Sequence, residues 1–170
     1  MIRSFVLIFV VILFATKSFS QSIAYANLNK ILNKSNVGSE IIKFYSKKNE
    51  KLLQQFKTKE AEIREKEKLL ISQKNILQND EYTNKLNSLK EEINNFNISN
   101  KEQLLSLKND QEKKTRLLMD DINVILKEYA EKNKIDIILQ SNQILIGKSS
   151  MDITDDILNI VNEKIKKFKN

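Results

Sequence analysis

Two rhythms of apolar and polar residues run along the 170-residue chain. Over most of the length, large apolar residues recur every three or four positions, which is the spacing of one face of a helix. Near both ends of this region, short β-branched runs place apolar residues at every second position, as half-buried strands do. The pattern therefore predicts a mostly α-helical protein with a small β component.

The first long helical segment starts at about residue 39. Its apolar seam steps by threes and fours, but one of the two alternating sets of seam positions turns polar at Lys59, Lys66 and Gln73. A tightly packed coiled coil keeps both sets apolar, so we predict a helix that packs only lightly against its partner. The seam comprises Ile42, Tyr45, Asn49, Leu52, Phe56, Lys59, Ile63, Lys66, Leu70, Gln73 and Leu77.

The helical spacing breaks between Leu77 and Tyr82, because a step of five fits neither three nor four. Asn79 and Asp80 lie in this interval, and such side chains favour turns by bonding the nearby backbone. Periodicity then resumes and continues to the end of the segment. We predict a helical hairpin over residues 39–133 with its tip near 78–84 and arms of about 60 Å. One unbroken helix is the alternative, since no Gly or Pro forces the turn.

Short strands are predicted on either side of this hairpin. Residues 23–28 alternate large and small side chains, and residues 135–139 and 144–146 flank a polar turn as the two strands of a β-hairpin. A final helix begins at Thr154, and two aspartates follow in its first turn, where the helix dipole favours acids.

These end pieces hold too little apolar surface to fold independently of one another. We expect residues 21–38 and 134–170 to form one compact body, from which the helical hairpin projects. Open strand edges favour pairing with another copy, so the chain is predicted to form a homo-oligomer through its β-rich bodies. The predicted assembly residues are Ile23, Tyr25, Leu28, Ile135, Ile137, Leu139, Ile144 and Ile146.

Residues 1–20 have the three-part pattern of a secretory signal peptide. Arg3 precedes an apolar run over residues 5–15, and Ser18 and Ser20 are the small residues that precede a cleavage site after Ser20. A membrane anchor is the alternative, but a spanning helix needs about 20 apolar residues. We therefore expect an exported protein that is soluble once it begins at Gln21.

Composition narrows the chemistry. The chain has no Cys and no His, which excludes a cysteine nucleophile, a His-based triad and the usual zinc ligand sets. The net charge of +7 falls to +5 when Arg3 and Lys17 leave with the signal peptide. Nearly all of it is lysine, which suits weak contact with acidic chains or anionic lipid rather than specific nucleic-acid binding. We expect no enzymatic activity, no catalytic residue, no metal and no cofactor.

Two short motifs have simpler explanations than ligand binding. Residues 147–149 (GKS) match the last three positions of a P-loop, but Asn142 stands where the loop requires its first glycine. Asp152, Asp155 and Asp156 are better explained by the start of a helix than by a metal site, because no oxygen-rich loop accompanies them.

Both ends of the exported chain resemble the Skp/OmpH family of periplasmic chaperones of Gram-negative bacteria. The resemblance is carried by IAYANLNKIL (residues 23–32) and IDIILQSNQILIGKSSMDITDDILNIVN (residues 135–162), while the long arms match in character alone. The family's Asp-Ile-Thr-x-Asp-hydrophobic-Leu helix start is matched by Asp152, Ile153, Thr154, Asp156, Ile157 and Leu158.

This resemblance implies a jellyfish-like homotrimer, in which a β-rich body carries three helical-hairpin tentacles around a cavity. Such proteins hold unfolded outer-membrane β-barrel proteins without ATP, and some have a proposed basic patch for lipopolysaccharide, which we do not locate in this sequence. An exported structural coiled coil of the cell envelope, without client binding, is the alternative. The candidate client-binding residues on the tentacle faces are Lys47, Lys51, Lys57, Arg64, Lys68, Lys101, Lys108 and Lys113.

Overall fold

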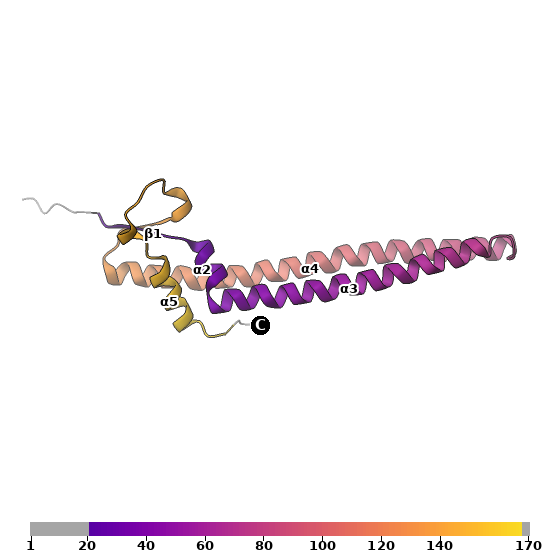
Figure 1. The fold of residues 1–170 in the computed structure, drawn as a ribbon, viewed down its shortest axis with the longest axis horizontal. Coiled ribbons are helices and arrows are strands. Elements are labelled where there is room, and N and C mark those ends of the chain that lie inside the picture. The colour runs from indigo at the N-terminus through magenta and orange to yellow at the C-terminus, as the bar shows by residue number, and fades with distance from the viewer. Residues whose placement is uncertain (1–20, 168–170) are drawn as a thin grey trace, which may run out of the picture.

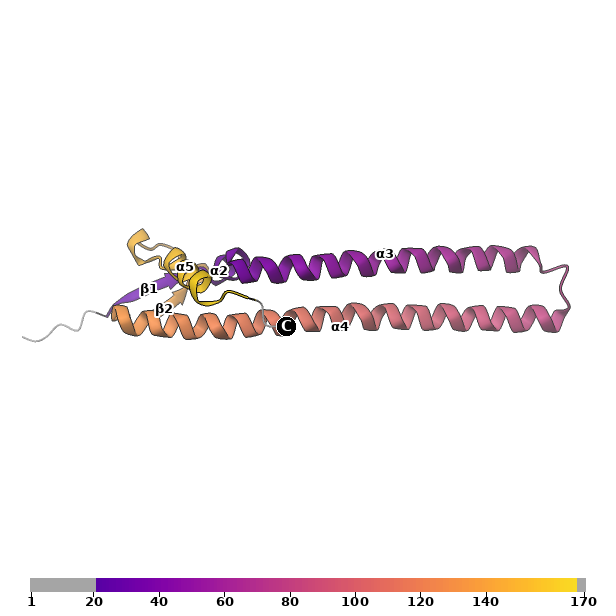
Figure 2. The ribbon, with the colours of Figure 1, turned by 90° about the horizontal axis from the view of Figure 1, so that it is seen from below.

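A computed structural model describes residues 21–167 of the chain. The predicted signal peptide lies outside the described residues. Two long helices run side by side as a hairpin, and all the other elements gather at one end of it (Figures 1 and 2). In chain order the elements are β1 (Ile23–Ala26), α2 (Leu28–Lys34), α3 (Asn36–Ser72), α4 (Asn79–Asn133), β2 (Ile137–Gln140), the 3-10 turns η1 (Ser141–Gln143) and η2 (Ser149–Met151), and α5 (Thr154–Lys164).

The hairpin is formed by α3 and α4, and its turn lies earlier than predicted. α3 ends at Ser72 and α4 begins at Asn79, so the turn covers residues 73–78 and most of the predicted tip is helical. Asp80 and Glu81 lie in the first turn of α4, where the positive end of the helix dipole stabilises acids. The short polar side chains that suggested a turn therefore begin a helix, and a single unbroken helix is wrong.

The hairpin also begins earlier than residue 39, at a sharp corner between α2 and α3. The hydroxyl of Ser35 accepts a hydrogen bond from the backbone N–H of Gly38 at 3.1 Å and so caps α3. A Cβ atom at Gly38 would lie 1.6 Å from the carbonyl oxygen of Leu32. Glycine at this position therefore lets α2 and α3 approach closely.

The sheet is parallel and has two strands, and the β-hairpin predicted after α4 is wrong. Ile23 of β1 is the register partner of Ile137 of β2, whereas residues 144–146 form no strand. The other edge of β1 is occupied by the chain that precedes α5, since the N–H of Ile153 donates to the carbonyl of Tyr25 at 3.0 Å. The sheet thus joins the two ends of the chain across the whole length of the hairpin.

The main core lies where these two ends meet the base of the hairpin. Ile31 of α2, Ile122 of α4, and Ile157 and Val161 of α5 are fully shielded from solvent. Each such side chain contributes roughly 1.5–3 kcal/mol of hydrophobic stabilisation. A second cluster, separate from the first, lies in the outer half of the hairpin and is centred on Ile63, Leu70 and Leu89.

Candidate functional site

The acidic residues before and within α5 serve the fold. Asp152 accepts a hydrogen bond from the backbone N–H of Thr154 at 2.9 Å, Asp155 pairs with Lys30 at 2.6 Å, and Asp156 accepts from the hydroxyl of Tyr129 at 2.7 Å. Between residues 21 and 167, no group of three His, Cys, Asp or Glu side chains is placed to hold a metal ion. No helix in that range combines the length and the hydropathy needed to cross a membrane. The contacts of these three aspartates are therefore explained by the packing of α5 against the rest of the chain.

One candidate surface is the outer side of the two-stranded sheet. Side chains of a strand alternate between its two faces, and Ala24 and Ala26 of β1 are buried against the core. The opposite side presents Ile23 and Ile137, which are 38% and 42% exposed. These two residues are register partners, so they form a contiguous apolar strip.

The loop between η1 and η2 extends this strip. It lies against the sheet, because the hydroxyl of Tyr25 donates to the carbonyl of Lys148 at 3.3 Å and a Cβ atom at Gly147 would lie 2.8 Å from the Tyr25 ring. Leu145 and Ile146 then point into solvent, 98% and 89% exposed, on a loop that stands out from the hairpin (Figure 1). We call the surface formed by Ile23, Ile137, Leu145 and Ile146 the body patch. Exposed apolar patches of this kind mark interaction sites.

Most of the predicted assembly residues lie on or beside the body patch. Tyr25 and Leu139 share a sheet face with Ile23 and Ile137 by strand alternation, and Ile144 is the first residue of the loop and is half-buried. Leu28 and Ile135 instead pack against the main core, so they are not available at this surface. Leu145 was missed, although the unbroken apolar run at residues 144–146 was a signal for it. Self-association through these residues stays a prediction.

The second surface is one long side of the hairpin, which we call the basic face. At about 3.6 residues per turn, positions that step by threes and fours form a stripe on each helix, and the two stripes flank the same side of the seam. Exposed lysines alternate there with apolar side chains, among them Leu53, Ile71 and Leu104, which are 43%, 68% and 38% exposed. The basic face consists of Leu53, Lys57, Glu60, Arg64, Lys68 and Ile71 on α3, and Lys90, Asn94, Asn97, Lys101, Leu104 and Lys108 on α4.

Five of the eight candidate client-binding residues lie on the basic face: Lys57, Arg64, Lys68, Lys101 and Lys108. Arg64 pairs with Glu60 at 2.7 Å, and Lys68 with Glu65 at 2.6 Å, on its own helix. Such exposed pairs contribute at most about 1 kcal/mol each and leave the cations accessible. Of the remaining three candidates, Lys51 lies on the other side of the hairpin and Lys47 and Lys113 lie on neither stripe.

The side of the hairpin opposite to the basic face is hollowed. Three adjoining hollows of about 540, 650 and 350 Å³ lie between α3 and α4. The first two share Gln55 and Gln103, and the last two share Ser88 and Glu92. They therefore form one continuous groove, which we call the amide groove because side-chain amides line its middle. Small or polar seam residues leave this space open where large apolar ones would fill it.

Three contacts between the helices border the amide groove. At the end near the body, the hydroxyl of Tyr45 donates to Asp110 at 2.6 Å. Burial, together with this carboxylate, raises the pKa of Tyr45 to about 12. In the middle, the rings of Phe56 and Phe96 meet edge to face with centroids 6.3 Å apart.

Further out, Glu92 of α4 bridges to α3 by pairing with Lys66 at 2.7 Å and Lys59 at 3.0 Å. Hydrogen bonds from Lys66 and Lys59 hold the pKa of Glu92 below its usual range. Hydrogen bonds to Glu92 and Glu62 raise the pKa of Lys59. These charges link the two helices at seam positions where apolar contacts are missing.

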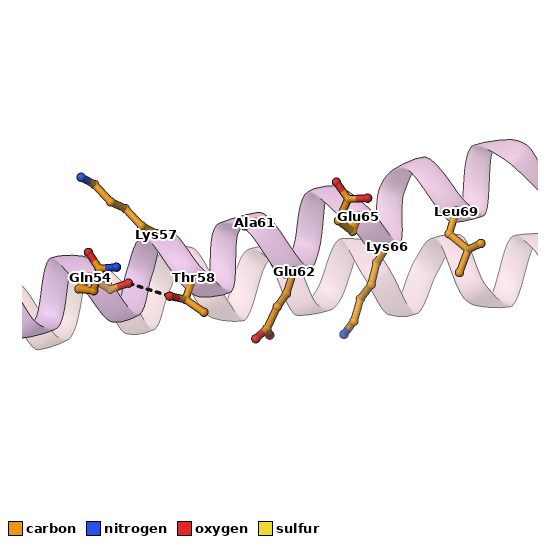
Figure 3. A pocket seen from close by; sticks show the side chains of 8 residues that line it. All are labelled: Gln54, Lys57, Thr58, Ala61, Glu62, Glu65, Lys66 and Leu69. Atoms are coloured by element: carbon orange, nitrogen blue, oxygen red, sulfur yellow. Dashed lines mark hydrogen bonds between the residues drawn. The ribbon is translucent and has the colours of Figure 1, made fainter.

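A further hollow lies over α3 alone (Figure 3). It has a volume of about 880 Å³ and is centred on the small side chain of Ala61. Lys66 and Leu69 point along its lower side and are shared with the outer end of the amide groove. Every lining side chain comes from one helix, so this hollow is an open surface rather than an enclosed site.

A family model described as outer membrane protein (OmpH-like) matches residues 22–161. This chain belongs to the OmpH family. The family that the two ends of the sequence predicted is thus confirmed. An OmpH-like protein from Caulobacter crescentus CB15, whose crystal structure is described as that of a candidate outer membrane chaperone, has a TM-score of 0.81 and 13% identity to it. The similarity covers 88% of this chain and 89% of the Caulobacter chain, and it shows that the fold is shared. No curated protein matches.

The amide groove is the feature of this OmpH-family chain that sequence reasoning missed. The lysines were predicted to bind the client because they are numerous, whereas the groove is formed by polar residues that line the interface between the two helices. The signal was present in the seam, which turns polar at several positions. Only the packing of α3 on α4 shows that these positions leave a hollow on one side.

Proposed function

We propose that this OmpH-family chain is an ATP-independent holdase chaperone. It binds unfolded outer-membrane β-barrel proteins and prevents their aggregation on the way across the periplasm. Membership of the OmpH family and the chaperone fold shared with the Caulobacter protein support this proposal.

The basic face is the observation that carries the proposal. An unfolded barrel protein exposes segments of alternating apolar residues that aggregate readily. Leu53, Ile71 and Leu104 offer such segments small apolar contacts along the arm, and the lysines between them attract acidic stretches. Many weak contacts hold a client without binding it so tightly that release requires ATP.

Holding a client in a cavity requires several arms, and the body patch provides a means of assembly. Burying Leu145 and Ile146 against a second copy removes large apolar side chains from water. The outer edge of β2 is also open within the described residues, since the sheet has two strands, and open edges favour pairing. We propose a homo-oligomer, a trimer by resemblance to the family, whose arms surround the client.

The proposed location is the periplasm, reached by export and cleavage of the signal peptide near Ser20. The mass of the protein isolated from the envelope should match a chain that begins at Gln21. An intact N-terminus would instead indicate an anchored stalk. The lysine excess also suits weak contact with anionic lipid or lipopolysaccharide. Such contact would keep the protein close to the membrane in which its clients are assembled.

The decisive test is aggregation of a urea-unfolded outer-membrane barrel protein on dilution, followed by light scattering, with and without residues 21–170 and without ATP. We expect suppressed scattering and a complex that contains one client for each closed oligomer. A folded, oligomeric protein that leaves scattering unchanged would favour a structural coiled coil of the envelope, the alternative function.

Assembly is tested separately with the double substitution Leu145→Asp and Ile146→Asp. We expect the oligomer to dissociate and holdase activity to fall, because each carboxylate would have to be buried in the interface. Ser149→Asp with Ser150→Asp is the matched control, since it adds the same charge to exposed residues of η2, directly after the loop. An unchanged oligomer mass in the Leu145 and Ile146 variant would remove the body patch from the proposal.

A further inference from the structure

We propose that the amide groove binds an extended segment of the unfolded client through the client's backbone. This inference rests on the proposed holdase function and names the surface of the arm that grips the chain. It adds a contact on the opposite side of the hairpin to those that the basic face provides.

The chemistry of the groove walls matches an extended backbone. Gln55, Asn95 and Asn100 line the groove, and each side-chain amide offers both a donor and an acceptor. Among the described residues, none of these three amides has a side-chain hydrogen-bond partner. An extended chain presents N–H and C=O groups in alternation. Amides that pair with this backbone would bind clients of different sequence equally well.

The floor of the groove is apolar and accommodates the side chains of the same segment. Phe56 and Phe96 lie half-buried at its middle, and Leu52 and Leu107 lie half-buried nearer the body. A barrel strand alternates apolar and polar residues. One set of its side chains can therefore contact these rings and leucines while the other set faces water.

The length of the groove matches one strand of the proposed clients. Its two larger hollows are lined by α4 from Ser88 to Asp110, which is about 33 Å along a helix. About ten residues of extended chain cover that distance, and a strand that crosses a membrane in a barrel has about 9–11 residues.

Charge distinguishes the two sides of the arm. Lysines line the groove as well, but several of them are paired with acids. Glu92 pairs with Lys59 at 3.0 Å and with Lys66 at 2.7 Å. The contacts proposed there are hydrogen bonds between uncharged amides, so they depend less on salt than contacts with charged groups do. Contacts with the lysines of the basic face weaken as salt screens them. Client binding that persists at high salt is therefore expected of the groove.

A cross-linking experiment locates the contact. The chain has no cysteine, so Ser99→Cys in the groove and Asn97→Cys on the basic face each carry a single benzophenone–maleimide label. Both positions are exposed and two residues apart on α4. With a urea-unfolded barrel protein at high salt, we expect at least about fivefold more cross-linked client from position 99 than from position 97. Hydrogen bonds are short, so a client bound in the groove lies next to the label at position 99. Equal yields would overturn the proposal.

A matched pair of double variants tests the amides themselves. Asn95→Ala with Asn100→Ala removes two groove amides, and Asn87→Ala with Asn109→Ala removes two exposed amides of α4 that lie in neither the groove nor the basic face. We expect about tenfold weaker client binding for the groove variant, for the loss of two hydrogen bonds, and no change for its control. Circular dichroism verifies that both variants are folded.

The outcomes separate this inference from the function on which it rests. If the wild-type protein holds the client and the Asn95 and Asn100 variant holds it equally well, the groove proposal alone fails. If the wild-type protein holds no client, the holdase proposal fails and the groove proposal falls with it.

Discussion

The body and the outer half of the hairpin are built on different principles. The core of the body contains twelve buried residues drawn from both ends of the chain and the base of the arm, whereas three buried residues form the cluster further out. Hydrophobic stabilisation follows buried apolar area, so most of the stability resides in the body. The outer arm is held by a thin apolar seam and by charges at its surface.

This difference suits a protein that assembles at one end and grips at the other. A densely packed body fixes where the arm starts, because close-packed interiors resist deformation. A lightly packed arm has low local stability and opens or bends at small cost. The polar seam residues that weaken the arm also create the amide groove, so adaptability and the proposed binding surface have the same origin.

The largest effect is expected in the body. Ile122→Ala should lower the free energy of unfolding by about 3–4 kcal/mol, because Ile122 is fully buried and its removal leaves a cavity. Urea denaturation at fixed protein concentration measures the loss. Val124→Ala, on the same helix but 57% exposed, should cost less than about 0.5 kcal/mol. Similar losses for the two variants would remove the basis for placing the core at the arm's base.

A smaller, local effect is expected in the outer arm. Leu89→Ala should cost about 2 kcal/mol and speed amide exchange in residues 60–96 by roughly thirtyfold. Exchange in α2 should stay unchanged, since Leu89 belongs to the separate outer cluster. Lys90→Ala is the control, being adjacent and exposed. Faster exchange in the body as well would show that the two regions unfold as one unit.

The boundary between the two regions is tested by Tyr45→Phe. Tyr45 is buried and donates to Asp110 across the hairpin, so we expect a loss of about 1 kcal/mol near neutral pH. The pKa of Tyr45 is raised from 10.0 to about 12 in the folded protein. Its protonated form therefore contributes stability that is fully present below pH 10 and is lost as the pH rises through 12.

The difference in unfolding free energy between wild type and Tyr45→Phe, measured from pH 9 to above pH 12, isolates this contribution from lysine titration. This difference in unfolding free energy should become smaller as the pH rises across that range. In an Asp110→Asn variant, tyrosinate absorbance should show Tyr45 ionising at lower pH than in the wild-type protein. A difference that is constant with pH would contradict the assignment.

The smallest effect is expected for Glu92→Gln in the outer arm. Glu92 links α4 to Lys66 and Lys59 at the surface, so its loss should lower arm stability slightly at low salt and not at all at high salt. Because the pKa of Glu92 is lowered, its contribution is present above the usual pKa of 4.5 and is lost as the pH falls through the folded value.

Glu91→Gln is the matched control, because Glu91 is adjacent and has no salt bridge to any described residue. Melting of the arm by amide exchange, at low and high salt, compares the two variants. An effect of Glu92→Gln that survives high salt would point to lost packing instead of lost charge.

The sequence predicted the helical hairpin well and its turn less well. Helical periodicity located both arms, because the same spacing recurs over many turns. The turn was placed too late, since asparagine and aspartate favour turns and helix starts for the same reason: they bond nearby backbone N–H groups. Leu77 and Tyr82, the residues on either side of the break, in fact both pack against the outer cluster.

The candidate site was predicted in part. The body patch contains Ile23, Ile137 and Ile146, which the strand pattern had selected. The lysines divide between two sides of the arm, which spacing alone could have shown once the seam was known. The polar seam positions were the only signal for the amide groove, and they do not predict a hollow, because a hollow depends on how far the two helices are held apart.

The sequence by itself determined the class of protein: repeated helical spacing over the long segment, two β-branched ends and the acidic start of the last helix. Tertiary structure alone decided the strand pairing. Alternation predicted a strand over residues 135–139, which the structure has at Ile137–Gln140, but alternation does not identify the partner strand. The helical hairpin brings residues 137–140 back beside β1. β1 is the partner, although residues 144–146 are nearer in sequence, because Ala24 and Ala26 of β1 pack into the core while Leu145 and Ile146 are exposed to solvent. Contacts between residues so far apart depend on the whole fold, which local pattern does not contain.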